Sequence, residues 1–172
     1  MITARLALRE INQNDAPFVL ALTNEPSFIE FIGDRGLRTI ADAQRYIETS
    51  HWTQYATHGF GLWLVQLRDT GESIGVCGLL KRDSLPAPDI GFAFRPPYWS
   101  QGYAFEAASF VKALARDVFK APRLLAIVEP SNAASIRLLT KLGLAYERMV
   151  RLSPTASEIA LYGVSFDTIA PS

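Results

Sequence analysis

Residues 89–107 read D-I-G-F-A-F-R-P-P-Y-W-S-Q-G-Y-A-F-E-A and carry the clearest signals of secondary structure in the chain. The apolar, β-rich run from Asp89 to Arg95 predicts a strand. Two prolines and Gly102 then predict a tight loop. Apolar residues at helical spacing from Phe105 to Phe119 predict a long helix after it. The stretch is therefore a strand, a loop and a helix in succession.

The loop is a candidate anion-binding site. The first amides of a helix, here those of residues 101–104, have no hydrogen-bond partner inside the helix. Together with the helix dipole they attract a phosphate or pyrophosphate, and Gly102 and the small Ala104 let such a ligand approach closely. Taken alone, the stretch also fits a simple turn before a helix, because it lacks the Gly-Lys-Ser/Thr of a P-loop and has only one Gly of the dinucleotide fingerprint.

A second informative stretch is E-P-S-N-A-A-S-I-R-L-L-T-K-L-G-L, residues 129–144. It follows Leu124 to Val128, a wholly apolar run typical of a strand buried on both faces. Asn132 is predicted to cap the next helix, with Ser135 in the same turn, and Gly143 is predicted to end it.

The remaining pattern predicts an α+β (mixed α/β) fold. Further strands are expected at residues 5–11, 62–68, 73–81, 146–152 and 158–164, and two helical regions between residues 14 and 59. With the helices at 105–119 and 132–142 this gives about four helices. The unit from Asp89 to Val128 should form a parallel strand pair with a right-handed crossover. No linker or repeat divides the chain, so residues 1–172 are interpreted as one domain.

The composition restricts the classes of function. Hydrophobic residues make up 49% of the 172, which is enough for a core that needs no structural metal. Lys+Arg and Asp+Glu balance at 17 each, so charge gives no reason to expect a nucleic acid or a membrane as partner. The one cysteine, Cys77, lies in an apolar run and is expected to be buried and inert. A single cysteine, no signal peptide and no apolar window of about 20 residues together favour a cytoplasmic protein.

Together, the two stretches resemble the GNAT superfamily of N-acetyltransferases, particularly its RimJ/RimL-like branch. The resemblance is carried by Y-W-S-Q-G-Y-A-F-E-A and N-A-A-S-I-R-L-L-T-K-L-G-L, and it covers residues 89–143 most clearly. Ser100 replaces a common Gly of the family, and Leu144 a common Phe. The resemblance implies a central, mostly antiparallel twisted sheet with a splayed parallel strand pair.

The resemblance implies acetyl-CoA as co-substrate, with the pantetheine arm between the splayed strands. The arm and thioester would lie along the backbone of one strand, the pyrophosphate on the loop, and the last helix would contact the arm. The residues implied as cofactor-binding are Phe92, Ala93, Phe94, Trp99, Gln101, Gly102, Tyr103, Ala104, Asn132 and Ser135.

The resemblance further implies direct attack of a neutral amine on the thioester in a ternary complex. Asp89 begins the splayed strand and is a candidate general base, and the open alternatives are Glu106, Glu129, His51 and His58. The family often places a Tyr or Ser seven residues after the Asn as the acid that protonates the departing thiolate. Leu139 occupies that position and cannot donate a proton, so Ser135, Tyr146 or water is the candidate acid.

The acceptor is expected to be a primary amine, either a protein N-terminus or a small molecule. An α-amine has a pKa of about 8 and is partly neutral at pH 7, which suits a chain without an obvious strong base. A homodimer is compatible with the family. A non-catalytic module that binds CoA is the alternative function, because Leu139 replaces the usual acid.

Overall fold

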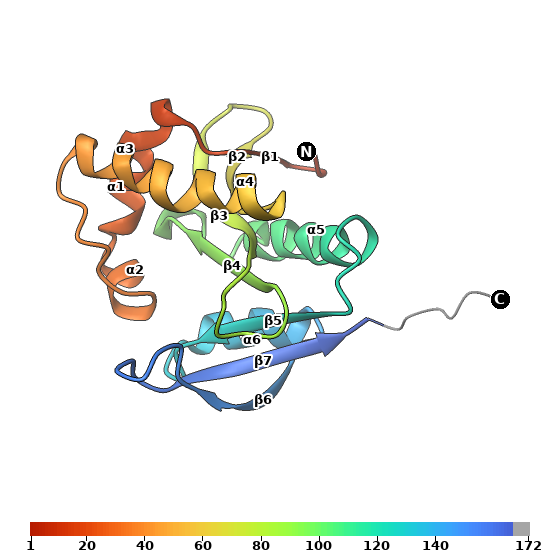
Figure 1. The fold of residues 1–172 in the computed structure, drawn as a ribbon. Coiled ribbons are helices and arrows are strands. Elements are labelled where there is room, and N and C mark those ends of the chain that lie inside the picture. The colour runs from red at the N-terminus through yellow and green to blue at the C-terminus, as the bar shows by residue number, and fades with distance from the viewer. Residues whose placement is uncertain (167–172) are drawn as a thin grey trace.

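Seven strands form one mixed sheet in the order β1-β2-β3-β4-β5-β7-β6 in the computed structural model, which describes residues 1–166 (Figure 1). The strands are β1 (Leu6–Arg9), β2 (Leu62–Leu67), β3 (Ser73–Leu80), β4 (Asp89–Phe94), β5 (Arg123–Val128), β6 (Ala145–Val150) and β7 (Ile159–Ser165). Each neighbouring pair is antiparallel except β4 and β5, which are parallel. The predicted mixed α/β class and the parallel pair are confirmed.

Helices cover both faces of the sheet. They are α1 (Ala16–Thr23), α2 (Pro26–Phe31), α3 (Ile40–Tyr46), α4 (Thr53–His58), α5 (Tyr103–Asp117) and α6 (Ala133–Lys141). A π-helical segment, Ile47–Trp52, joins α3 to α4, so these two form the one long stretch that the sequence predicts. The helix α2 is additional to the four expected. Pro26 starts it at the first helical position, and six residues are too few to show a helical period.

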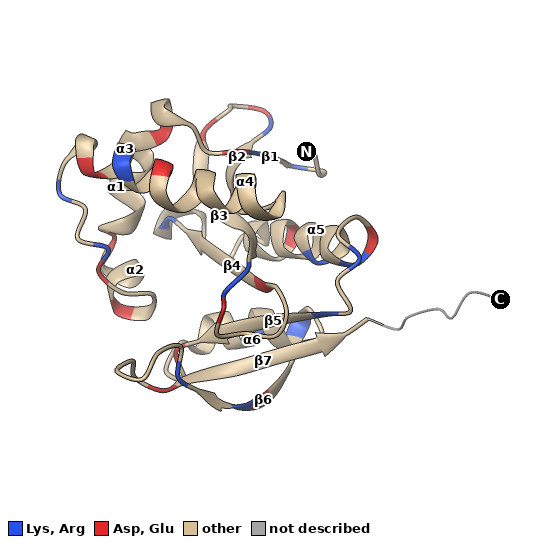
Figure 2. Ribbon diagram, in the orientation of Figure 1, with Lys and Arg blue, Asp and Glu red and all other residues tan. Residues whose placement is uncertain are grey.

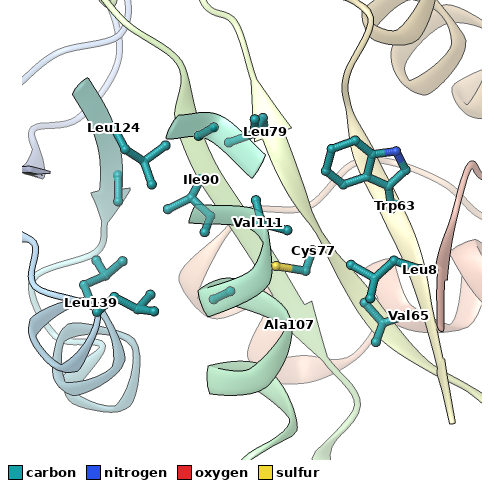
Figure 3. Packing of buried hydrophobic residues seen from close by; sticks show 14 of the residues in the cluster. Leu8, Trp63, Val65, Cys77, Leu79, Ile90, Ala107, Val111, Leu124 and Leu139 are labelled. Atoms are coloured by element: carbon teal, nitrogen blue, oxygen red, sulfur yellow. The ribbon is translucent and has the colours of Figure 1, made fainter. Parts of the chain in front are cut away.

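The main core lies between the sheet and α5. Ala107 and Val111 of α5 pack with Cys77 and Leu79 of β3 in one fully buried cluster, to which Leu139 of α6 also belongs (Figure 3). A second cluster lies on the opposite face, where α1 and α3 cover β2 and β3. The predicted burial of Cys77 is confirmed, and desolvation raises the pKa of its thiol.

Candidate active site

The strands β4 and β5 part at the centre of the sheet. They share one register pair, Asp89 with Leu125, and the N–H of Leu125 donates to the carbonyl of Pro88 at 2.9 Å. No further β4–β5 pair forms among the described residues, although both strands continue for several residues (Figure 1). The pair is therefore closed at its amino end and open at its carboxyl end. This is the splayed parallel pair that the family resemblance implies.

The backbone of Phe92 faces this opening. The N–H of Arg95 donates to the carbonyl of Ile74 in β3 at 2.9 Å. Backbone groups in an antiparallel ladder alternate between the two sides of a strand, so those of Ala93 also point to β3 and those of Phe92 and Phe94 point away from it. The carbonyl of Phe94 accepts from Nε1 of Trp99 at 2.7 Å. The main chain of Phe92 can thus pair with a ligand, whereas that of Ala93 belongs to the β3–β4 ladder.

The loop between β4 and α5 presents unpaired amides at the open end of the strand pair. Ser100 and Gly102 both have left-handed φ angles, 59° and 82°. Within the part of the chain that the structure describes, the N–H groups of residues 100–105 have no acceptor. These donors form a concavity of the kind that binds anions. The left-handed conformation also explains why Gly is the more favourable residue at position 100.

An ionic cluster from the N-terminal segment holds this loop. The carboxylate of Glu106 accepts from Thr3 Oγ1 at 2.6 Å and from the backbone N–H and Nε of Arg5 at 2.7 Å each. The guanidinium of Arg5 also donates to the carbonyl of Gln101 at 2.9 Å and lies 4.4 Å from the ring centre of Tyr103. Partial burial raises the pKa of Glu106, but the hydrogen bonds from Thr3 and Arg5 outweigh it, and the net pKa is lowered. The carboxylate therefore anchors the first turn of α5.

The start of α6 lies at the same open end, directly after β5. Oδ1 of Asn132 accepts from the N–H of Ser135 at 3.1 Å, so the predicted helix cap is confirmed. Ser135 itself is half-buried. Leu139 is fully buried in the main core and has no role in proton transfer.

Asp89 lies at the closed end of the strand pair. Its side chain is 1% exposed, and both carboxylate oxygens are 3.1 Å from Nε of Arg82. Burial raises the pKa of Asp89, and the nearby guanidinium of Arg82 opposes that shift without cancelling it. Five residues of extended strand separate Asp89 from Phe94, about 16 Å. An arm that enters along β4 from the loop therefore points toward this carboxylate.

Tyr146 lies away from the opening between β4 and β5. It lies on β6, the edge strand, with 55% of its surface exposed and its ring edge-on to Tyr162. Two strand spacings separate β6 from β5, roughly 10 Å. Ser135 is thus the candidate acid nearer to the strand opening.

The other face of the sheet holds a small cavity of about 30 Å³, lined by Phe28, Thr23 and His51 among others. That volume accommodates a water molecule and not an amine acceptor. His51 is buried there, and desolvation lowers its pKa to about 4, so it is neutral at pH 7.

Arg5, Thr3 and Arg82 contact the candidate site residues but were not singled out from the sequence. Their partners lie 101, 103 and 7 residues away. No local spacing signals the two long-range contacts. The one available clue is Glu106, an acidic residue on a helix whose neighbours are apolar and which therefore needs a distant basic partner.

The parted strands and the loop beside them define an acetyltransferase fold. An acetyltransferase from Agrobacterium tumefaciens superposes with a TM-score of 0.80 at 23% identity, over 96% of this chain and 94% of that one. The RimL ribosomal L7/L12 α-N-protein acetyltransferase, solved with coenzyme A, superposes with a TM-score of 0.81 at 14% identity, over 97% of both chains.

The chain belongs to the GNAT acetyltransferase family, because the family model described as "Acetyltransferase (GNAT) domain" matches residues 5–145. Its relatives include two proteins of Bacillus subtilis. The uncharacterized N-acetyltransferase YoaA is 31% identical over 151 residues, which is 87% of this chain and 84% of the relative. The uncharacterized protein YkkB is 29% identical over 156 residues, 88% of each. The chain is therefore an acetyltransferase, and its family transfers acetyl groups from acetyl-CoA to amines.

Within residues 1–166 no helix has the length and apolar character to cross a bilayer. The same residues contain no group of three or more His, Cys, Asp or Glu side chains that could hold a metal ion.

Proposed function

We propose that this protein moves the acetyl group of acetyl-CoA to a primary amine by direct attack in a ternary complex. The observation that carries the proposal is the coincidence of three features at the carboxyl end of the β4–β5 pair. The strands β4 and β5 open there, the amides of residues 100–105 have no acceptor there within residues 1–166, and α6 begins there with Asn132 and Ser135.

In the proposed complex the diphosphate accepts hydrogen bonds from the loop amides of Gln101, Gly102, Tyr103 and Ala104. The pantetheine arm runs into the opening along β4 and pairs with the main chain of Phe92, as another strand would. The N–H of Phe92 stabilises the oxyanion that forms at the thioester carbonyl. Asn132, Ser135, Trp99, Phe94 and the methyl group of Ala93 supply the remaining walls.

Asp89 is the proposed general base. Its raised pKa makes this carboxylate a better proton acceptor than an ordinary aspartate, and it lies at the end of the path that the arm would follow. Each carboxylate oxygen that receives the Arg82 Nε–H has a further lone pair for an ammonium group or a bridging water. Ser135 is the proposed proton donor to the thiolate, and Tyr146 is the less favoured one because of its edge-strand position.

The proposed acceptor is an α-amine, with small amines as the second class, and the RimJ/RimL-like branch is the proposed subfamily. Two neighbours illustrate both classes: RimL is named an α-N-protein acetyltransferase, and a Vibrio cholerae neighbour with a TM-score of 0.76 and 11% identity is a spermidine N-acetyltransferase. We assign the chemistry to one domain, residues 1–172, in the cytoplasm, and expect a monomer or homodimer.

A thiol-release assay tests the proposal. Purified protein is mixed with acetyl-CoA and, in turn, a peptide with a free N-terminus, a polyamine and an aminoglycoside, and free thiol is followed with a chromogenic disulfide. Cys77 is fully buried and should give little background. Acceptor-dependent thiol release supports acetyl transfer. Tight CoA binding without release for any acceptor would instead favour a non-catalytic CoA-binding module.

A further inference from the structure

The buried carboxylate of Asp89 has one ionic partner within residues 1–166, the guanidinium of Arg82. Nε of Arg82 lies 3.1 Å from each carboxylate oxygen, so one N–H is shared between the two oxygens. The side chain of Asp89 is 1% exposed and that of Arg82 is 32% exposed. A carboxylate buried this deeply is stable in its charged form only beside such a partner. Arg82 therefore governs the charge that Asp89 can carry.

The loop that carries Arg82 joins β3 to β4 and is fixed by hydrogen bonds. Basic and acidic segments lie close together in this part of the chain (Figure 2). Gln54 of α4 accepts from the N–H of Lys81 at 3.1 Å and donates to its carbonyl at 3.3 Å. Nζ of Lys81 donates to the carbonyls of Arg82 at 3.1 Å and Leu85 at 2.8 Å. These bonds hold the backbone at Arg82, so its side chain approaches Asp89 in a defined direction.

The same loop packs against β5 and β7. Leu85 and Ala87 are buried in a small cluster with Leu125 of β5 and Leu161 of β7. Leu125 is also the register partner of Asp89 in the one β4–β5 pair. The loop therefore spans the closed end of the strand pair, where its conformation does not depend on what enters the open end.

The strands and the helices next to Asp89 meet it and its loop with uncharged side chains. Its register partners are the apolar Leu80 of β3 and Leu125 of β5. The helix α4 reaches the adjoining loop through the neutral amide of Gln54. The helix α5 covers the opposite face of β4, because side chains alternate along a strand and Ile90 belongs to the cluster beneath α5. The charges that act on Asp89 thus come from its own loop.

Two cations of the loop act on this carboxylate. Burial raises the pKa of Asp89, Arg82 lowers it through its charge and its hydrogen bond, and Lys81 lowers it to a smaller extent. The remaining ionisable residue of the loop, Asp83, is exposed. Removal of the Arg82 charge would leave the effect of burial largely unopposed, so the folded protein would keep Asp89 protonated up to a higher pH.

We propose that Arg82 is a positioning residue for acetyl transfer, which holds the Asp89 carboxylate ionised and in a fixed plane for the acceptor amine. This inference rests on the assignment of Asp89 as the base in the proposed function. The N–H shared between the two oxygens restricts rotation of the carboxylate, and each oxygen keeps a lone pair that can accept a proton from an ammonium group or a bridging water. Without the Arg82 charge, the carboxyl group would hold a proton of its own and could not accept another.

The dependence of kcat on pH tests this, measured by thiol release with one acceptor for all variants so that titration of the acceptor is common to them. The inflection that Asp89→Asn removes should move upward by at least about one pH unit in Arg82→Gln, and the rate below the inflection should fall about tenfold or more, because an adjacent opposite charge shifts a carboxyl pKa by about one unit or more. Arg82→Lys keeps the charge but not the shared N–H, so it should restore the inflection and only part of the maximal rate.

Arg9→Gln is the matched control. Arg9 on β1 pairs at 2.7 Å with Asp15, another buried carboxylate, and its side chain is 39% exposed. Loss of this pair should lower the free energy of unfolding in urea, as loss of the Arg82 pair does, and leave the pH profile of kcat unchanged.

An inflection that stays in place in Arg82→Gln, or that moves equally in Arg9→Gln, would overturn the inference while leaving the proposed function intact. A wild-type pH profile in Asp89→Asn would also overturn it, since Arg82 would then have no base to position, although acetyl transfer would stand. If Arg82→Gln does not fold, Arg82→Lys decides, because a wild-type maximal rate in that variant would contradict the role of the shared N–H. Absence of thiol release by the wild-type chain with every acceptor would overturn both the inference and the proposed function.

Discussion

Replacing Gly102 by Ala should weaken CoA binding through the backbone. Gly102 has φ of 82° immediately before α5, in the left-handed region. An alanine there costs about 1–2 kcal/mol, offset by about 0.4–1 kcal/mol from the reduced freedom of the unfolded chain. The added Cβ would also lie 3.2 Å from the nearer terminal nitrogen of Arg5, whose guanidinium holds Glu106 and the carbonyl of Gln101.

The loop can relieve this strain by turning toward negative φ, which redirects the amides that are proposed to hold the diphosphate. Loss of one or two of those hydrogen bonds to a charged ligand corresponds to about 1.5–3 kcal/mol, or a fall in affinity of roughly tenfold to a hundredfold. Calorimetry with CoA measures the affinity, and urea unfolding measures the stability of the same samples.

Gly71→Ala is the control for strain alone. Gly71 has φ of 74° in the turn between β2 and β3, and a Cβ there would meet nothing within 4 Å. It should lose about the same stability as Gly102→Ala and keep full CoA affinity. Should Gly102→Ala bind CoA as tightly as the wild-type chain, or should Gly71→Ala lose affinity to the same extent, the role of the loop amides would be refuted.

Three further predictions concern ionisable residues. Glu106→Ala should lower the free energy of unfolding by about 2 kcal/mol and weaken CoA binding, because the donors of Thr3 and Arg5 lose their acceptor; denaturant titration that shows no loss would contradict the anchoring role. Burial lowers the pKa of His51 from 6.5 to about 4, so on acidification the unfolded chain binds a proton at this residue before the folded chain does. The free energy of unfolding should therefore fall as the pH drops from 6.5 toward 4, by about 2 kcal/mol between pH 7 and 4.5. Unfolding curves of His51→Phe should lack that part of the pH dependence, and an identical pH profile would exclude His51 as its source. Asp89→Asn should lower turnover about a hundredfold and remove the rise of the rate with pH. In the wild-type protein the rate should rise with pH because the carboxyl group, whose pKa is raised, loses its proton. Thiol release at the wild-type rate would rule out Asp89 as the base.

Local patterns in the sequence predict much of the fold. The run from Asp89 through Gly102 to Phe119 contains an apolar strand, turn residues and a helical period, and each is a signal within a few residues. The cap at Asn132 is local in the same sense and is confirmed. The six-residue α2 was not predicted, because a short helix that begins at Pro26 shows no period of its own.

The candidate site is less predictable, because tertiary contacts decide it. The ladder between β3 and β4 determines that the main chain of Phe92, and not that of Ala93, faces the strand opening, and a sequence does not reveal which side a backbone group takes. The contacts of Arg5 with Glu106 and Gln101 join segments about a hundred residues apart. The roles of Asp89, Ser135 and Tyr146 stay predictions.

The single rung between β4 and β5 has a mechanical consequence. The sheet has two parts, one formed by β1 to β4 and the other by β5, β7 and β6. One register pair, Asp89 with Leu125, and the helices that pack across the sheet join the two parts. A molecule that lies along Phe92 would connect the two parts of the sheet and supply hydrogen bonds that β4 and β5 do not make with each other. Amide hydrogen exchange in β5 should then be slower in the complex with the acetyl donor than in the free protein, because the bound donor completes the sheet.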